Sequence, residues 1–493
     1  MSKFNKKEDN RTTNRSGFPA YKMTMKEQLV TETLTTMFGE PKFYGSTDDS
    51  IISHAIIMAG SDPEFLCKLA CYARNVGNMR SVSHALTAVI ARHAREYTRT
   101  AVRNVVVRPD DLPEIMSCYK SLFGKPFPNA LKREAAEMIM SFDEYSLAKY
   151  NKKSGAIKLR DILRITHPAP KTQEESDLLR RLMDDRLQIP YTWETELSEK
   201  GNRKEVWDAL ISSGKVGYMA MLRNLSNMIS CGTDISPVLE RLSDPEEVRR
   251  SRQLPFRFFS AYKMLDQRGL LSPELHRALE AALRCSLDNM EHIPGRTLIA
   301  VDCSGSMNTK VSRDSVICCC EIGTLFGAMA SHICEDATVC FFDCTKYSSF
   351  NNSKGYKIAR FGRHDSILDI TARYSAAGGG TEMSLPMAYA LREDPTRDIK
   401  PFDRVIYFSD SECNTFGRIY GMHTVMELVE KYRNKYNPKL WVHGVDLLGY
   451  GTQQFTGPGF NLIAGWSDTV LPFIMLAEKG IGTLVKTIQE YKL

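Results

Sequence analysis

The spacing of apolar residues changes abruptly near Pro294, and this change constrains the fold more than any other feature of the chain. From about residue 25 to 289, apolar residues recur at helical spacing, as in the run LKREAAEMIMSF (131–142), with short Gly, Pro and Asp segments between the runs. No fixed repeat length is visible. The first part therefore predicts an irregular, HEAT-like array of stacked helix pairs.

After residue 295 the pattern alternates between short β-rich runs and helical runs, which is typical of a doubly wound parallel sheet. We expect helices at about 312–334, 385–391 and 424–436, between the strands TLIAVD, ATVCFF, RVIYFSD and KLWVHGV. The predicted fold class is mainly α, with a helical-repeat domain at 21–292 followed by an α/β domain at 296–493. Residues 1–20 are polar and are expected to form a disordered tail.

Composition and charge narrow the class of protein. No apolar run reaches the ~20 residues that a membrane span needs, so a cytoplasmic protein without membrane association is expected. Thirteen cysteines, an odd number without a CxxC pair, indicate reduced thiols. Residues 1–290 hold 44 Lys and Arg against 37 Asp and Glu, a net charge of +7, whereas residues 291–493 hold 21 against 22, a net charge of −1. The basic excess belongs to the helical part.

The string LIAVDCSGSM (298–307) leads a buried strand directly into small oxygen-bearing side chains. Ligands of open α/β sheets lie outside the carboxyl ends of the strands, and hydroxyl and carboxylate oxygens suit Mg²⁺ or Mn²⁺ better than zinc. Two more oxygens follow other predicted strand ends, after the glycines of AGGGTE and at the end of YFSD. The predicted ligands of a divalent cation are Asp302, Ser304, Ser306, Thr381 and Asp410.

Two alternatives accompany this metal site. An isolated DxSxS string is equally typical of a capped helix start, and only its combination with the other two strings favours the metal. A serine hydrolase would need a G-x-S-x-G elbow, which neither serine of the loop has, and no Walker A string occurs. We therefore expect no enzyme.

A basic run lies in the helical part, from KYNKKSGAIKLRDILR (149–164) to a histidine just beyond. Most such runs are solvated helix faces, but lysines and arginines around a Ser-Gly turn also suit the phosphates of a nucleic acid, which they contact without reading bases. The candidate nucleic-acid-binding residues of this run are Lys149, Lys152, Lys153, Lys158, Arg160, Arg164 and His167.

Several strings of the first part, among them FDEYSLAKYN (142–151), LRDILRITHPAP (159–170) and LPFRFF (254–259), resemble the TROVE module of Ro-type RNA-binding proteins. The second part, with DCSGSM and AGGGTEMSLPM, resembles a von Willebrand factor A domain with a metal-ion-dependent adhesion site. Together the two resemblances cover nearly the whole chain.

The resemblance implies a ring of HEAT-like helices closed by the A domain. It implies a monomeric, non-catalytic RNA chaperone or quality-control factor, which binds small noncoding Y-like RNA on an outer basic surface and single-stranded ends of misfolded RNA in a central cavity. By position, the Y-RNA contacts fall on Lys149, Lys153 and His167, and Lys132 and Arg133 are also basic in the family. A protein partner such as an exoribonuclease is expected at the A domain.

The alternative is an A-domain adhesion or protein-interaction scaffold that the helical part merely supports. The position of the basic excess discriminates between the two, because an adhesion scaffold needs no phosphate-facing run outside its metal-bearing domain.

Overall fold

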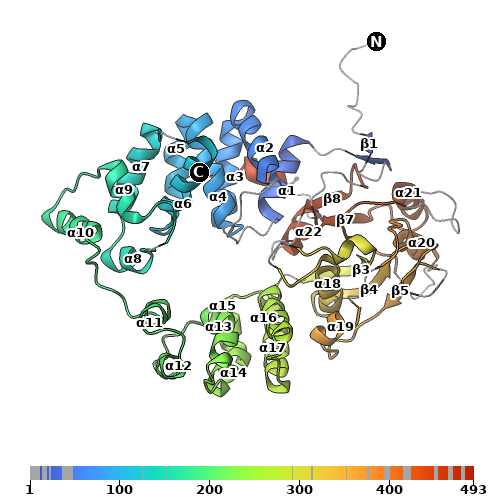
Figure 1. Cartoon of the computed structure of the whole chain (residues 1–493). Helices are drawn as coiled ribbons and strands as arrows, with labels where there is room; N and C mark the ends of the chain where they lie inside the picture. Colours follow the sequence, from blue (N-terminus) through green and yellow to red (C-terminus); the bar gives the residue numbers. More distant parts are fainter. Residues whose placement is uncertain are drawn as a thin grey trace, which may run out of the picture. The chain divides into compact units, whose positions relative to one another are not determined.

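The structure is a computed structural model, and it divides into two compact units, each described here by itself (Figure 1). One unit contains residues 24–199 and 481–493, and the other contains residues 1–23 and 200–480. The residues that the structure describes are 11–13, 19–21, 24–35, 48–124, 126–152, 154–290, 292–311, 315–350, 352, 354–374, 378–392, 400–414, 424–448, 454–464, 470–478 and 484–493.

The first of these units is a helical array, as the apolar spacing predicts. Its helices start at local signals such as Asp62, whose side chain accepts from the Phe65 amide while Pro63 occupies the first helical position. The last helix of the chain, α23, packs against α3 and α1, a contact that no local pattern indicates. The helices are α1 (Met25–Thr35), α2 (Asp48–Ser61), α3 (Pro63–Asn75), α4 (Arg80–His93), α5 (Thr98–Val105), α6 (Asp111–Phe123), α7 (Asn129–Met140), α8 (Glu144–Lys149), α9 (Leu159–Thr166), α10 (Gln173–Met183), α11 (Trp193–Lys200) and α23 (Leu484–Gln489).

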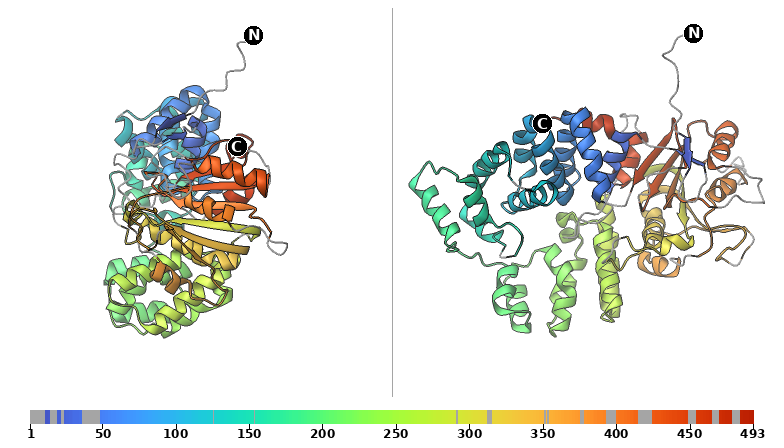
Figure 2. Two further views of the ribbon diagram at one scale, coloured as in Figure 1. Left: turned by 90° about the vertical axis from the view of Figure 1, so that its right-hand side faces the viewer. Right: turned by 45° about the horizontal axis from the view of Figure 1, so that its top comes forward.

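The other unit begins with further helix pairs and continues into a sheet. Asp244-Pro245 and Ser272-Pro273 start two of its helices with the same cap chemistry. Helices α13, α14, α16 and α17 pack side by side (Figure 2). The helices are α12 (Lys204–Ser212), α13 (Tyr218–Ser230), α14 (Ser236–Ser243), α15 (Pro245–Ser251), α16 (Pro255–Gln267) and α17 (Pro273–Ser286). A two-stranded antiparallel pair, β1 (Arg11–Thr13) with β2 (Pro19–Tyr21), lies within the first residues of the chain, where the sequence predicts only a disordered tail.

The α/β part contains a six-stranded sheet of order β5-β4-β3-β6-β7-β8. The first strand of the domain, β3, is central, because the chain adds β4 on one side of it and β6 on the other. The strands are β3 (Ile293–Asp302), β4 (Cys334–Phe342), β5 (Tyr356–Ala359), β6 (Arg404–Ser409), β7 (Trp441–Asp446) and β8 (Phe460–Ala464), and the helices are α18 (Cys319–Ile333), α19 (Ile367–Tyr374), α20 (Leu385–Arg392), α21 (Val425–Lys435) and α22 (Val470–Glu478).

Alternate residues of the central strands face opposite layers, as the twofold repeat of a strand requires. One face packs with α20 and α21 into a continuous apolar cluster that includes Leu298, Phe342 and Tyr407. The opposite face receives α18, where a Cβ on Gly323 would lie 2.9 Å from Val301. Glycine therefore lets this helix lie directly on the sheet, and the doubly wound architecture is confirmed.

Strand β5 departs from the predicted all-parallel sheet, since it pairs with β4 antiparallel. Parallel neighbours need a crossover, usually a helix, whereas the residues that the structure describes between β4 and β5 (343–350, 352, 354 and 355) contain no helix. The first predicted helix of the domain is also shorter than expected and begins at Cys319, while residues 312–314 of the predicted span lie outside the described part of the chain.

Helix α17 is attached to the α/β domain by its acidic and basic side chains. The Glu280 carboxylate accepts hydrogen bonds from the backbone amides of Ile367 and Leu368, at 2.9 and 3.0 Å, and so caps the start of α19. Arg284 donates to the carbonyl oxygen of Arg363 at 2.6 Å. The helical and α/β parts of this unit are therefore coupled by directed hydrogen bonds.

The structure bears on two expectations from composition, the state of the cysteines and the presence of membrane-spanning helices. All thirteen cysteines are free thiols, and most are buried, in agreement with reduced cysteines. No helix among the described residues is both long and apolar enough to cross a membrane.

Candidate functional site

The predicted metal ligands converge at the carboxyl edge of the sheet, where the strand order switches. Asp302 is the last residue of β3, and Asp410 directly follows β6, its neighbour in the sheet. Both carboxylates are fully buried. Since the chain leaves the sheet in opposite directions at this point, the loops after the two strands flank the position at which open α/β sheets bind their ligands.

Backbone hydrogen bonds tie the three predicted loops together. The Gly305 amide donates to the Gly379 carbonyl at 3.1 Å, and the Gly378 amide donates to the Cys303 carbonyl at 2.7 Å. Thr381 is fixed in turn, because its amide donates to the side-chain oxygen of Asn414 at 2.9 Å. The loops carrying the serines, the threonine and the second aspartate are therefore held against one another.

The two carboxylates differ in their hydrogen bonding. Asp302 accepts from the Ser409 hydroxyl at 2.6 Å and from the Ser304 amide at 2.8 Å. Burial, together with the charge of Asp410, nevertheless raises the pKa of Asp302 to about 7. The Oδ2 atom of Asp410 is buried and has no hydrogen-bond partner among the described residues. A buried carboxylate oxygen without a partner is costly unless a cation or donor meets it.

A third strand-end carboxylate, which the sequence analysis did not single out, shapes the same edge. Asp343 follows β4 and accepts from the amide and hydroxyl of Ser349, at 2.5 and 2.8 Å, so it folds the loop 343–350 back on itself. A Cβ on Gly379 would lie only 2.5 Å from the Tyr347 carbonyl oxygen, and Gly379 has φ of +77°. Glycine at position 379 is therefore required by close packing as well as by backbone conformation.

The side-chain set at this edge is one of hard oxygen ligands. The hydroxyl oxygens of Ser304 and Ser306 lie 3.2 Å apart, beside the buried carboxylate of Asp302. No group of three or more His, Cys, Asp or Glu side chains suited to a metal occurs in the described part of the chain. The predicted ligands at this edge are two carboxylates and three hydroxyls, a set that fits Mg²⁺ or Mn²⁺ and does not fit zinc, whereas the Asp343 carboxylate is engaged by Ser349.

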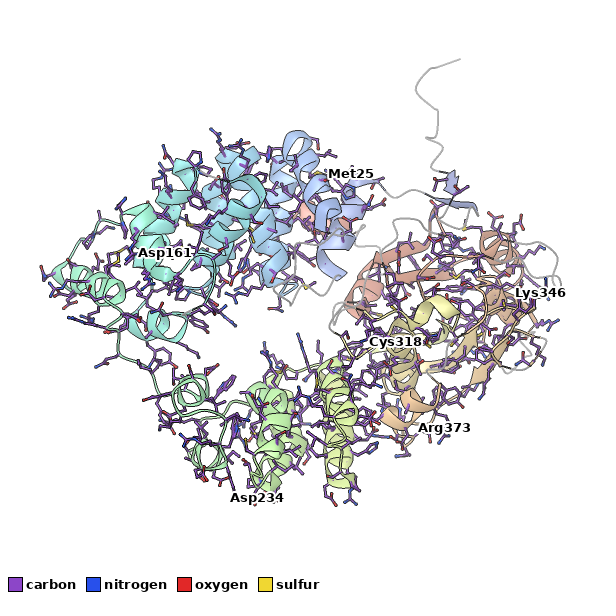
Figure 3. All side chains as sticks on the ribbon, viewed as in Figure 1. Met25, Asp161, Asp234, Cys318, Lys346 and Arg373 are labelled. Carbon is purple, nitrogen blue, oxygen red and sulfur yellow. The ribbon has the colours of Figure 1, made fainter. Side chains whose placement is uncertain are left out.

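The basic run lies on and around α8 and α9, which Figure 3 locates by the label on Asp161. Lys149 ends α8, Arg160 lies in the first turn of α9, and His167 follows its last turn with a left-handed φ of 49°. All three side chains are exposed, whereas Lys158 is half-buried. None of these four side chains forms an ion pair with a described carboxylate.

Other predicted contacts are already engaged by acidic side chains. Lys152 lies 3.1 Å from Asp110 and 3.5 Å from Glu114. Arg164 lies 3.5 Å from Asp161, and Arg133 lies 3.5 Å from Glu134. Lys132 is half-buried on α7, which packs against α9, and Lys153 lies outside the described residues. The run therefore divides into cations with and without acidic partners, a distinction invisible in the sequence.

A buried carboxylate that the sequence did not indicate organises the neighbouring loop. Asp111 is fully buried and accepts from the backbone amides of Val107 and Arg108, at 2.9 and 2.8 Å. Burial alone would raise its pKa, but hydrogen bonds and charges from His84 and Arg80 hold the pKa of Asp111 well below its ordinary value. The loop that carries Arg108 is therefore fixed from inside.

The fold and these two sites define a class of protein: a helical-repeat chain with a basic surface, followed by an A-type α/β domain with an oxygen-lined strand edge. The TROVE domain model matches residues 13–185 and 181–279, and the Ro60 vWA domain model matches residues 296–474. The chain therefore belongs to the TROVE family and carries a Ro60-type von Willebrand factor A domain.

Two curated relatives and one solved structure are similar to this chain. The chain is 29% identical over 298 residues to telomerase protein component 1 of Rattus norvegicus, covering 43% of this chain and 11% of that protein. It is 28% identical over 290 residues to the RNA-binding protein RO60 of Caenorhabditis elegans, covering 56% of this chain and 42% of that protein. Each match therefore spans less than half of the relative's length. The Deinococcus radiodurans RO (RSR) protein has a similar fold, with a TM-score of 0.65 at 17% identity over 93% of this chain and 100% of that one.

Proposed function

We propose that this protein binds RNA without catalysing a reaction on it, and that the cations around α8 and α9 contact the phosphates. The observation that carries the proposal is the set of basic side chains without acidic partners, Lys149, Lys158, Arg160 and His167, within one short stretch of the helical unit. Exposed cations without acidic partners, such as Lys149 and Arg160, displace counterions from the RNA phosphates that they contact, which makes binding strong and salt-dependent. Membership of the TROVE family supports the same conclusion.

The test compares cations that differ in their acidic partners. Replacing Lys149 and Arg160 together by alanine should weaken binding of a structured RNA and lower the slope of log affinity against log salt by about two. Lys152→Ala is the matched control, because this lysine already pairs with Asp110 and should change the slope by less than about half a unit. Equal slopes for wild type and the double variant would contradict the proposed surface.

The kind of RNA and the role of its binding are inferred from the family resemblance. We propose that the bound RNA is a small noncoding, Y-like RNA, that single-stranded ends of misfolded RNA enter a central cavity, and that the protein serves RNA quality control. An RNA stem with a 3′ overhang should then compete better than the same blunt stem, since a duplex cannot thread a narrow opening. Equal competition by the blunt stem would contradict binding of free ends.

We further propose that the sheet edge holds Mg²⁺ or Mn²⁺ through Asp302, Ser304, Ser306, Thr381 and Asp410. The support is the buried, unpartnered oxygen of Asp410 together with the hydroxyls clustered beside Asp302. A bound cation would offset the two buried charges and present a remaining coordination position to an oxygen of a partner. The A domain would then recruit a protein partner, such as an exoribonuclease, to the bound RNA.

Calorimetry of the full chain tests the metal. Asp302→Ala should abolish Mg²⁺ and Mn²⁺ binding and leave RNA affinity within about threefold, because the predicted phosphate contacts lie on helices of the other unit. Asp446→Asn, at the end of the neighbouring strand β7, should retain metal binding. Retained binding in Asp302→Ala would show that the DxSxS loop only caps a helix, and a large loss of RNA affinity in a folded variant would contradict the separation of the two sites.

A further inference from the structure

Two tyrosine rings and two cations alternate beside the basic surface. The Arg108 guanidinium lies 5.5 Å from the centroid of the Tyr150 ring. The Lys149 ammonium lies 5.7 Å from the same ring and 5.8 Å from the ring of Tyr145. One ammonium is therefore within cation–π distance of both rings, and the order along the cluster is Arg108, Tyr150, Lys149, Tyr145. We call these four side chains the aromatic–cation cluster.

The cluster faces solvent. Tyr145 is 54% exposed, and Arg108 and Lys149 are exposed as well. Neither cation pairs with a described carboxylate, in contrast to Lys152 close by in sequence. Since exposed cations and aromatic faces without acidic partners gain little within the fold, the arrangement fits an external ligand that is both anionic and flat.

Contacts on both sides hold the cluster in place, a buried carboxylate on one side and a partly exposed ion pair on the other. Asp111 fixes the loop that carries Arg108 by accepting its amide at 2.8 Å. Helix α8, which carries Tyr145 and Lys149, is anchored by Glu144, whose carboxylate accepts from Arg181 at 2.8 and 3.1 Å. A ligand would therefore meet side chains whose backbone is already ordered, which lowers the entropy that binding has to offset.

We propose that the aromatic–cation cluster is a stacking site for unpaired bases of a single RNA strand, with the cations holding the flanking phosphates. This inference rests on the proposed RNA-binding function and adds the class of RNA that this part of the surface takes. Every nucleobase has a flat face, so stacking on tyrosine is tolerant of sequence, whereas a duplex keeps its bases stacked on one another and offers only its backbone. The cluster thus distinguishes unpaired from paired RNA.

The experiment uses the full chain and fluorescence anisotropy with two labelled probes, a short oligouridine strand and a blunt RNA duplex, at several salt concentrations. Tyr145→Leu keeps apolar area but removes the aromatic face, and it should weaken binding of the single strand by about fivefold or more. Its salt slope should stay that of the wild type, because no charge is lost. Tyr145→Phe should bind within about twofold of wild type, as should Tyr191→Leu, which removes another exposed tyrosine.

The outcomes separate the inference from the function on which it rests. Duplex binding by the wild type without binding of the single strand would overturn the stacking site and leave RNA binding intact. Absence of binding to both probes would overturn both. If Tyr145→Leu lost affinity for both probes equally, the effect would come from phosphate contacts or folding, and the proposal would be overturned. Unchanged affinity of Tyr145→Leu for the single strand would also overturn it and leave the exposed rings to a protein partner.

Discussion

Replacing Asp111 by alanine removes the acceptor at the centre of the buried charge cluster behind the basic surface. The carboxylate accepts five hydrogen bonds: from Arg80 at 2.6 Å, His84 at 2.9 Å and Arg74 at 3.1 Å, and from the amides of Val107 and Arg108. Breaking a buried pair by deleting one partner typically costs about 3–5 kcal/mol. Because Arg80 is 27% exposed and can regain water, we expect the lower end, about 3 kcal/mol.

The assay is urea unfolding of the full chain followed by circular dichroism, with Glu114→Ala as the control. Glu114 is half-exposed and lies 3.5 Å from Lys152, so its removal should cost less than about 0.5 kcal/mol. Asp111→Asn keeps one acceptor oxygen, so its loss of unfolding free energy should lie between those of Asp111→Ala and Glu114→Ala. A loss below about 1 kcal/mol for Asp111→Ala would refute the view that this carboxylate fixes the loop.

Two further predictions concern buried contacts. Burial lowers the pKa of His84, whose neighbours are Asp111, Arg74 and Arg80, so the folded state resists protonation that the unfolded chain accepts below about pH 6.5. The free energy of unfolding should therefore fall as pH drops below 6.5, by up to about 1.4 kcal/mol per pH unit. In urea unfolding at several pH values, His84→Gln should reduce this pH dependence. An unchanged pH dependence in the variant would contradict the assignment to His84. Glu280→Ala should speed hydrogen exchange of the two backbone amides that Glu280 caps at the start of α19. Glu274→Ala, on the same helix α17, should leave their exchange unchanged. Equal protection of these amides in both variants would contradict the coupling of α17 to α19.

Local sequence patterns predicted the elements, but not the contacts made between distant segments. The strand ending in Asp302 follows from the apolar run before it, whereas its place at the switch point depends on the strand order, which only the structure shows. The antiparallel edge strand Tyr356–Ala359 is too short to show alternation, so it was missed. The packing of Leu484–Gln489 on α3 depends on tertiary contacts that no local window contains.

Local sequence patterns are limited in the same way for the basic surface, because they do not show which charges pair in the fold. The charge run does not distinguish Lys149 from Lys152, whereas the structure shows that Lys152 already has two acidic partners, Asp110 just before α6 and Glu114 within it. Arg108 lies outside the run, and its position over the Tyr150 ring comes from the loop that Asp111 folds. Charge composition locates a surface, but pairing within the fold decides which of its cations are available to a ligand.

Ultraviolet cross-linking of the full chain to bound RNA, followed by mass spectrometry of the cross-linked peptides, tests the central claim most directly. The account predicts cross-links within residues 143–167, which contain α8, α9, the exposed Tyr145 and the half-buried Tyr150. Cross-links confined to residues 296–474, the A domain, would contradict it and would move RNA recognition to the sheet edge.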